Sequence, residues 1–379
     1  MPVPLPSSQD VDLHPPDADE VALIGRGLAS AVRVDGELTE LQRSVLAAMT
    51  RSMTGVEVDY TAPAPMTAHE FAEVLARRDE SFRTRMVQIM ELGHMILPEP
   101  SVEVADRVIE FAAELSVDDD CVHLARALAD GSRQLVAADF DRNRYLTELD
   151  LSAFTPLSSA DDKTAAWTTT AEVDELARRW IDLGDLAEGS LGRGVHDFYL
   201  ARGFRFPGQA GSAPPLLAQH DWVHVLADYG SVVASELEVF AFIARASDDP
   251  AAFSLLAMVI NLFQTGGVAS AAGIFEASPG HLEGDGMPRR LADALRRGAL
   301  CDGSVDFLAV DWFSLAEEPI EDVRDRFGVV AKSDDAVAAG SPGPWTAGGI
   351  SEFQLAAGRD LAAEQARPYD AFGAEVATA

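Results

Sequence analysis

The chain has 379 residues, which is enough to bury a sizeable core and to form two domains. A hydrophobic content of 47% and a charged content of 24% are ordinary for a soluble globular protein. The formal net charge of −33 at pH 7 is not ordinary. It excludes nucleic acid as a partner and limits membrane contact to the periphery, because both surfaces would repel the protein.

The cysteine content and the N-terminus indicate the compartment. Only Cys121 and Cys301 are present, which is too few for a disulfide framework. The first residues are rich in proline and lack the basic and apolar regions of a signal peptide. We therefore expect a cytoplasmic protein, and peripheral contact at the inner membrane remains compatible with the sequence.

The first part of the chain predicts a tail followed by a helical domain. Residues 1–19 are rich in proline, serine and aspartate, so we expect a mobile tail there. Apolar residues recur at helical spacing over 20–150, without strand-like alternation. Thr39-x-x-Gln42 and Thr67-x-x-Glu70 are capping boxes that predict the starts of two helices.

A resemblance accompanies this first domain. Its apolar first helix ends in Asp-Gly-Glu-Leu-Thr at residues 35–39 and resembles the start of the helical bundle in tellurite-resistance TerB-like domains. The resemblance implies a helical domain over 20–150. Asp35, Glu37 and Glu40 could hold a divalent cation there, but turn and capping chemistry explains them more simply.

A linker and a second helical domain follow. Residues 151–168 are rich in serine, threonine and aspartate and predict a linker. Helical patterns then continue over 169–332, including a basic helix at 288–300, and small residues predict an irregular tail at 333–379. The uncharged stretch 251–275 contains amides and paired glycines, so we expect a buried helix or a cavity lining rather than a membrane span.

The second domain contains the most informative motif of the chain. His220, Asp221 and His224 can share one face of a helix, because they lie at about 0°, 100° and 40° around its axis. Glu236 lies on the apolar stripe of the next helix, where an unpaired carboxylate would be costly to bury. Two imidazoles and one or two carboxylates that converge are typical of a metal site.

The turn between the two helices makes convergence feasible. Residues 228–231 form a turn signal, and Gly230 lies six residues after His224 and six before Glu236. A helical hairpin that bends at Gly230 would return Glu236 to the height of His224. The simpler alternative is a pair of core histidines with a hydrogen-bonded glutamate. The predicted fold class is all-α, with two helical domains and a hairpin that carries the metal site beside an apolar cavity.

Several roles remain open at this site. His220, His224 and Glu236 form a two-histidine, one-carboxylate set that suits zinc as a Lewis acid or iron(II) binding oxygen. Asp221 could be a fourth ligand, a hydrogen-bonding partner of an imidazole, or a catalytic base. Tyr229 could donate a hydrogen bond to a substrate carboxylate, or pack within the turn.

The second domain also resembles the family of coenzyme Q biosynthesis protein 4, which assists ubiquinone synthesis. That family's motif is HDxxH, eleven residues and a glutamate, and it is met at His220, Asp221, His224 and Glu236. Flanking segments agree at residues 186–192, 198–200, 229–230, 311–312 and 319–324. The resemblance covers about 155 to 330, and neither the first domain nor the C-terminal tail belongs to the common family pattern.

This resemblance implies a helical fold with an apolar cavity beside a metal, with zinc favoured. It also implies a hydrophobic, prenylated aromatic substrate and oxidative replacement of a ring carboxyl by hydroxyl. A related metabolite of natural-product biosynthesis is the alternative substrate. We therefore favour a metal-dependent decarboxylase, hydroxylase or lyase. The alternative is a non-catalytic, isoprenoid-binding scaffold with a structural metal, which would recruit other biosynthetic enzymes. A homodimer is compatible with either.

Overall fold

The computed structural model describes two stretches of the chain. They are residues 16–117, apart from 62 and 98–100, and residues 174–374, apart from 211, 213–214, 248–255, 257–258, 261–262 and 265–279. The secondary structure of these described residues is helical, and the isolated bridges Val34 to Glu37 and Ser190 to Pro319 are its only β pairings. The predicted all-α class is confirmed.

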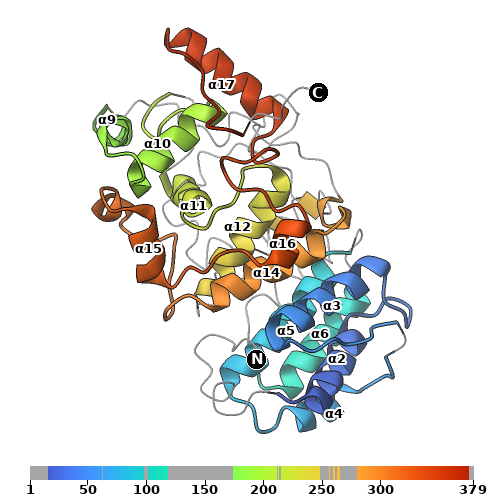
Figure 1. Ribbon diagram of the computed structural model, residues 1–379. Coiled ribbons are helices and arrows are strands. Elements are labelled where there is room, and N and C mark those ends of the chain that lie inside the picture. Colours follow the sequence, from blue (N-terminus) through green and yellow to red (C-terminus); the bar gives the residue numbers. More distant parts are fainter. Residues whose placement is uncertain are drawn as a thin grey trace.

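The N-terminal helices pack around one apolar core (Figure 1). Thr39 and Thr67 form the capping boxes that their sequences predict. Asp35 and Gly36 both have positive φ values in the turn that precedes the first of these boxes, so turn and capping chemistry accounts for this acidic segment. The helices are α2 (Ala18–Val32), α3 (Glu40–Thr54), α4 (Ala68–Val74), α5 (Glu80–Met95) and α6 (Val102–Glu114).

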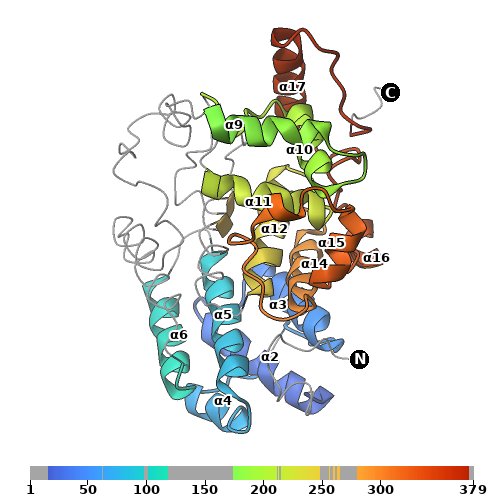
Figure 2. The same ribbon diagram turned by 90° about the vertical axis from the view of Figure 1, so that its left-hand side faces the viewer.

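In Figure 2, the helices of the second part lie above the N-terminal helices. The basic segment predicted at 288–300 is helix α14 (Met287–Ala299). The others are α9 (Asp174–Ile181), α10 (Leu191–Arg202), α11 (Pro215–Leu226), α12 (Val233–Ala246), α15 (Ile320–Phe327), α16 (Asp334–Ala338) and α17 (Glu352–Glu364), with 3-10 turns η3 (Asp182–Asp185), η5 (His281–Glu283) and η6 (Trp312–Leu315).

Helix α14 connects the two parts of the molecule, because it packs on α12 and on α3 (Figure 1). A Cβ at Gly298 would lie 2.3 Å from the carbonyl oxygen of Phe242, so only glycine permits this approach to α12. On the other side, the Ser52 hydroxyl of α3 donates to the carbonyl of Ala292 at 3.0 Å. The main cluster of buried apolar residues extends through both parts, and a smaller cluster lies between α10 and the C-terminal segment. The predicted linker at 151–168 lies outside the described residues.

The segment 333–379 was predicted to be an irregular tail, but part of it is helical. It contains α16 and α17, and Ser351 and Gln354 form a capping box at the start of α17. That signature is the one that marks Thr39 and Thr67, but the surrounding glycine and proline residues obscure it. Helix α17 packs on α10, and its segment therefore belongs to the folded molecule (Figure 1).

The two remaining predictions fall partly outside the described residues. Residues 1–15 of the predicted mobile tail lie outside them, and α2 begins at Ala18, capped by the side chain of Asp17. Most of the uncharged stretch 251–275 lies outside them as well, and so does the predicted cavity lining. Its described apolar side chains are buried at Leu256, Val259, Ile260 and Phe263. No helix among the described residues is long and apolar enough to cross a bilayer.

Candidate metal centre

The consecutive helices α11 and α12 bring the four residues of the motif together. The Nε2 atom of His220 lies 3.3 Å from Oε2 of Glu236, and Nε2 of His224 lies 3.3 Å from Oε1 of the same carboxylate. Nε2 of His220 is also 3.5 Å from Oδ1 of Asp221. All four side chains are buried, with at most 7% of any residue exposed. The group formed by His220, Asp221 and His224 could hold a metal ion, since its ligand atoms lie within 4.8 Å of one another.

The connection between α11 and α12 differs in one respect from the sequence prediction. The positive φ value in it belongs to Asp228, at 61°, and not to Gly230. Gly230 is required for another reason, because a Cβ there would lie 2.6 Å from the Cα atom of Gly349. The backbone of the C-terminal segment crosses this connection directly, and the Gly230 and Ser231 amides donate to the carbonyls of Pro342 and Gly349.

The hydrogen bonds of His224 fix its tautomer. Its Nδ1 atom lies 2.7 Å from the carbonyl oxygen of Gly230, which can only accept, so Nδ1 carries the proton. In the neutral ring, Nε2 is then an acceptor. This atom is fully buried, has no hydrogen-bond partner among the described residues, and faces a Glu236 oxygen that also can only accept. A cation or an additional proton between these two atoms would relieve their repulsion.

Asp221 has two distinct oxygen environments. Its Oδ2 accepts a 2.5 Å hydrogen bond from the hydroxyl of Tyr199 on α10, whereas Oδ1 faces His220. Burial raises the pKa of the Asp221 carboxyl, and the neighbouring histidines partly oppose that effect. Burial also raises the pKa of Tyr199 far above its ordinary range, so the phenol is a stable donor.

Glu236 has the opposite electrostatic environment. Burial by itself would raise the pKa of this carboxyl, but protonated His224 and His220 would add positive charge and donate hydrogen bonds to it, and these effects lower the pKa to about 2. Nearby, burial lowers the pKa of the Arg202 guanidinium to about 9. The lowered pKa of Glu236 shows that this carboxylate is stabilised by positive charge on the side that faces the imidazoles.

Aromatic rings surround the cluster. Phe198 stacks on His224 with ring centroids 5.3 Å apart, and Phe240 stacks on His220 at 5.0 Å. The guanidinium of Arg202 lies 3.6 Å from the centre of the Phe198 ring and donates to the hydroxyl of Ser231 and the carbonyl of Pro344. The imidazoles are thus held between flat apolar surfaces, which restrict both their rotation and the access of water.

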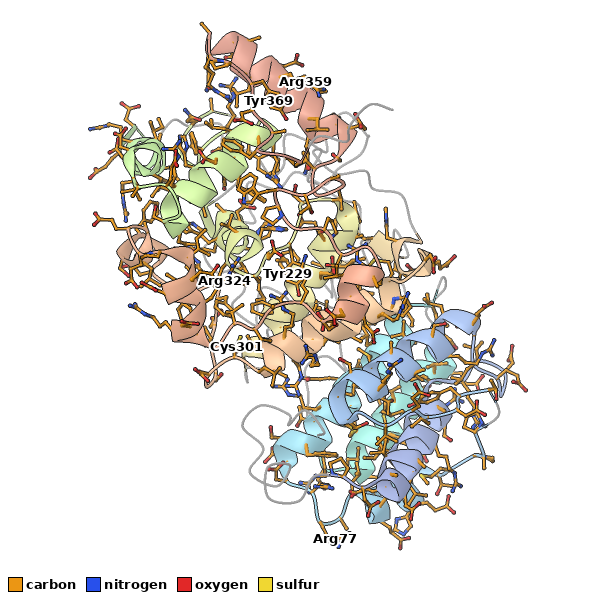
Figure 3. The ribbon with its side chains drawn as sticks, viewed as in Figure 1. Arg77, Tyr229, Cys301, Arg324, Arg359 and Tyr369 are labelled. Carbon is orange, nitrogen blue, oxygen red and sulfur yellow. The ribbon has the colours of Figure 1, made fainter. Side chains whose placement is uncertain are left out.

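Two segments that flank the motif in the sequence meet beside it. The amides of Leu191 and Gly192 donate to the carbonyls of Glu318 and Ala316, and the Ile320 amide returns a bond to Gly189. Arg324 extends from α15 toward α11, where it donates to the terminal carbonyls of Leu226 and Val225 (Figure 3). These contacts fix the end of the helix that carries both histidines.

Tyr229, the other predicted catalytic residue, has its contacts in a different group. Its buried ring lies near the guanidinium of Arg297 at 4.9 Å, the ammonium of Lys332 at 5.0 Å and the ring of Phe242 (Figure 3). Burial raises its pKa above the range in which a phenol acts as an acid or base. Of the two roles considered for Tyr229, a hydrogen bond to a substrate carboxylate and packing within the turn, these contacts agree with packing.

The structure adds residues that the sequence prediction did not assign to the site. Tyr199 and Arg202 lie on α10, and Gly349 and Gln354 lie in the C-terminal segment, where Gln354 binds Ser231. The only signal for Tyr199 was its place in a flanking segment of the motif. A described cavity of about 710 Å³ lies elsewhere, at the start of α3, and none of the four cluster residues lines it.

Comparison with known proteins gave no match to this chain, either among protein-family models or among curated proteins and solved structures. The geometry and chemistry of the cluster are therefore the basis for any functional conclusion.

Proposed function

We propose that this chain is a metal-dependent enzyme that acts on a hydrophobic aromatic or quinone-type metabolite. Zinc is the favoured metal, and His220, Asp221, His224 and Glu236 are its ligands. One observation carries the proposal. The protonated Nδ1 of His224 leaves a buried, unpartnered Nε2 directed at a carboxylate oxygen, and a divalent cation satisfies both atoms at once.

The distances between donor atoms support zinc. Donors about 2.0–2.1 Å from a zinc ion at the corners of a tetrahedron lie about 3.3–3.4 Å from one another. Oε2 of Glu236 lies 3.3 Å from the His220 nitrogen, Oε1 of Glu236 lies 3.3 Å from the His224 nitrogen, and Asp221 lies 3.5 Å from His220. The donor set of two nitrogens and two carboxylates also balances the charge of a divalent ion.

The residues around the metal support an aromatic, hydrophobic substrate. Phe198 and Phe240 present flat apolar surfaces against the two imidazoles, and the site is closed to bulk water by burial. The metal would act as a Lewis acid that polarises a substrate oxygen. In the alternative in which only His220, His224 and Glu236 bind the metal, Asp221, with its pKa raised by burial, would be suited to accept or return a proton at the substrate.

The reaction that we propose is oxidative decarboxylation or hydroxylation of an aromatic ring, in which dioxygen would serve as the oxidant and supply the hydroxyl oxygen, and a ring carboxyl would leave as carbon dioxide. It follows from the resemblance of the motif and its flanks to the coenzyme Q biosynthesis protein 4 family. Iron(II) is the second candidate metal, because zinc has no redox chemistry of its own. Elemental analysis of the purified protein would identify the metal, and native mass spectrometry would identify any hydrophobic molecule that copurifies.

A non-catalytic scaffold with a structural metal is the second candidate function. The observation that favours it is the presence of four protein donors, since structural zinc sites are closed by four protein ligands and catalytic sites keep one position for water or substrate. Binding of a small anion such as azide to the cobalt-substituted protein would distinguish the two, because only a site with an exchangeable position would change its visible spectrum.

Substitution of a ligand tests the metal proposal directly. We expect His224→Ala to lower bound zinc from about one equivalent to a small fraction, since zinc needs its imidazole ligands. Helical content, measured by far-ultraviolet circular dichroism, should change little. His94→Ala is the matched control, because His94 is also fully buried but lies on α5, away from the cluster. Full zinc occupancy in His224→Ala would contradict its role as a ligand.

A further inference from the structure

We propose that Tyr199 is a positioning residue of the metal centre, which restricts Asp221 to binding through the single oxygen Oδ1. The inference rests on the proposed function and deepens it, because it concerns how the site selects its metal. A carboxylate can bind a metal through one oxygen or through both, and the two modes suit different ions.

The hydrogen bond from Tyr199 separates the two oxygens of Asp221. Its hydroxyl donates to Oδ2 at 2.5 Å, while Oδ1 is the oxygen 3.5 Å from Nε2 of His220. To bind through both oxygens, Asp221 would have to give up this buried hydrogen bond. The loss would leave the phenol without its acceptor, in a place where water cannot replace it.

The ring of Tyr199 cannot move aside to avoid that loss. It stacks on Phe206 with an angle of 12° between the ring planes and centroids 5.4 Å apart. Trp180 lies 5.1 Å away and Phe204 meets the ring edge-on at 5.7 Å. Only 1% of Tyr199 is exposed. Packing on several sides fixes the hydroxyl, and the hydroxyl in turn fixes the plane of the carboxylate.

Single-oxygen binding favours a small ion with few ligands. His220, Asp221 and His224 offer three converging donors, and one oxygen of the adjacent Glu236 would bring the number to four, which zinc prefers. Binding through both oxygens of Asp221 would raise the number to five or more and favour larger ions with more oxygen ligands. Tyr199 therefore contributes to selectivity as well as to affinity.

Tyr199→Phe tests the inference, because it retains the ring and removes only the hydroxyl. We expect its dissociation constant for zinc to rise about 10- to 100-fold, the usual effect of removing a group that orients a ligand. In the cobalt-substituted protein, the intense visible absorption typical of four-coordinate cobalt should weaken as coordination expands. Tyr60→Phe is the matched control, since Tyr60 is equally buried on the N-terminal side and its hydroxyl bonds Thr50 at 2.8 Å.

The outcomes separate this inference from the proposed function. Failure of the wild-type protein to bind zinc or cobalt would end both. Normal binding by the wild type, with the same affinity and spectrum in Tyr199→Phe, would overturn the role of Tyr199 alone. A crystal structure of the zinc-loaded wild type needs no variant. It should show one Asp221 oxygen on the metal, and two oxygens bound there would overturn the inference even if Tyr199→Phe does not fold.

Discussion

Two buried histidines of this protein are each oriented by a backbone carbonyl, with different consequences. His224 bonds Gly230 through Nδ1 and directs Nε2 at Glu236, so its free nitrogen faces a carboxylate. His94 bonds Ser101 through Nε2 at 3.1 Å, and its buried Nδ1 has no hydrogen-bond partner. Burial lowers the pKa of His94 to about 4, and its bond to the Ser101 carbonyl only partly opposes that effect.

His94 should therefore make stability depend on pH. Its pKa in the folded state is about 4, below the ordinary 6.5, so the unfolded chain binds a proton first as pH falls. The contribution of neutral His94 is fully present above pH 6.5 and declines as pH falls from 6.5 to 4. Between pH 7.5 and pH 5, we expect it to cost the wild type up to about 2 kcal/mol of unfolding free energy.

Urea unfolding at these two pH values provides the measurement. His94→Gln keeps a donor for the Ser101 carbonyl and cannot be protonated in this range, so it should lose less stability than the wild type between pH 7.5 and pH 5. Equal losses in the two proteins would show that His94 does not titrate as expected.

At this scale the sequence predicted part of the site. Helical spacing and a turn signal were enough to bring His220, His224 and Glu236 together, because those three depend on local geometry. The bond from Tyr199 to Asp221 depends on how α10 packs on α11, and no spacing rule predicts that. The two alternatives for Tyr229 stayed open in the sequence for a related reason, since the direction of its side chain depends on the packing of α12 and α14.

Among the elements, the connection between α11 and α12 is the most constrained. Gly230 passes so close to the backbone of Gly349 that a side chain at Gly230 has no room. The same connection orients His224 through the Gly230 carbonyl and receives bonds from Arg202 and Gln354 through Ser231. The C-terminal segment is therefore part of the scaffold of the metal centre.

Gly230→Ala tests this constraint. We expect it to lower the free energy of unfolding by about 1–3 kcal/mol, because the new methyl group would overlap the Gly349 backbone. It should also weaken zinc binding, since the Gly230 carbonyl holds His224. Denaturant unfolding and zinc titration are the measurements.

Gly340→Ala is the control for that experiment. Gly340 has a φ of 83° with nothing within 4 Å of its Cβ position, so alanine there causes backbone strain of about 1 kcal/mol but no overlap. Its zinc affinity should equal that of the wild type. Similar zinc affinities in Gly230→Ala and Gly340→Ala would show that the close approach of Gly230 and Gly349 does not affect zinc binding.

The elements themselves were largely predictable, with one informative failure. Capping boxes at Thr39 and Thr67 and the basic stripe of α14 predicted helices where the structure has them. The C-terminal segment was expected to be irregular because glycine, proline and small residues dominate it. Its order comes from long-range hydrogen bonds to the connection and to α10, which local sequence does not encode.

At the scale of the whole molecule, α14 should make the two parts unfold together. It packs on α3 and α12 at once, and one apolar cluster extends through both parts. All five tryptophans lie at or beyond residue 167, so tryptophan fluorescence reports only on the second part.

The effect on stability of a substitution in the first part should therefore be measurable by tryptophan fluorescence from the second part. Leu46 is fully buried on α3, and Leu46→Ala should cost about 2–5 kcal/mol. We expect the urea midpoint measured by tryptophan fluorescence to fall to the same extent as the midpoint measured by circular dichroism. A fluorescence midpoint that stays at its wild-type value would mean that the parts unfold independently.

The crossing of Gly230 and Gly349 has a consequence for the synthesis of this protein on the ribosome. Ser231 and its partner Gly349 are separated by 118 positions, so a ribosome releases both imidazoles long before it releases the segment that locks them. A nascent chain would therefore expose the two histidines to cellular metal ions before the C-terminal segment holds the connection that orients them. On the proposed metal role, the correct ion would be loaded late, after the C-terminal segment has folded, and stalled or prematurely terminated chains would be the forms most open to binding a wrong ion.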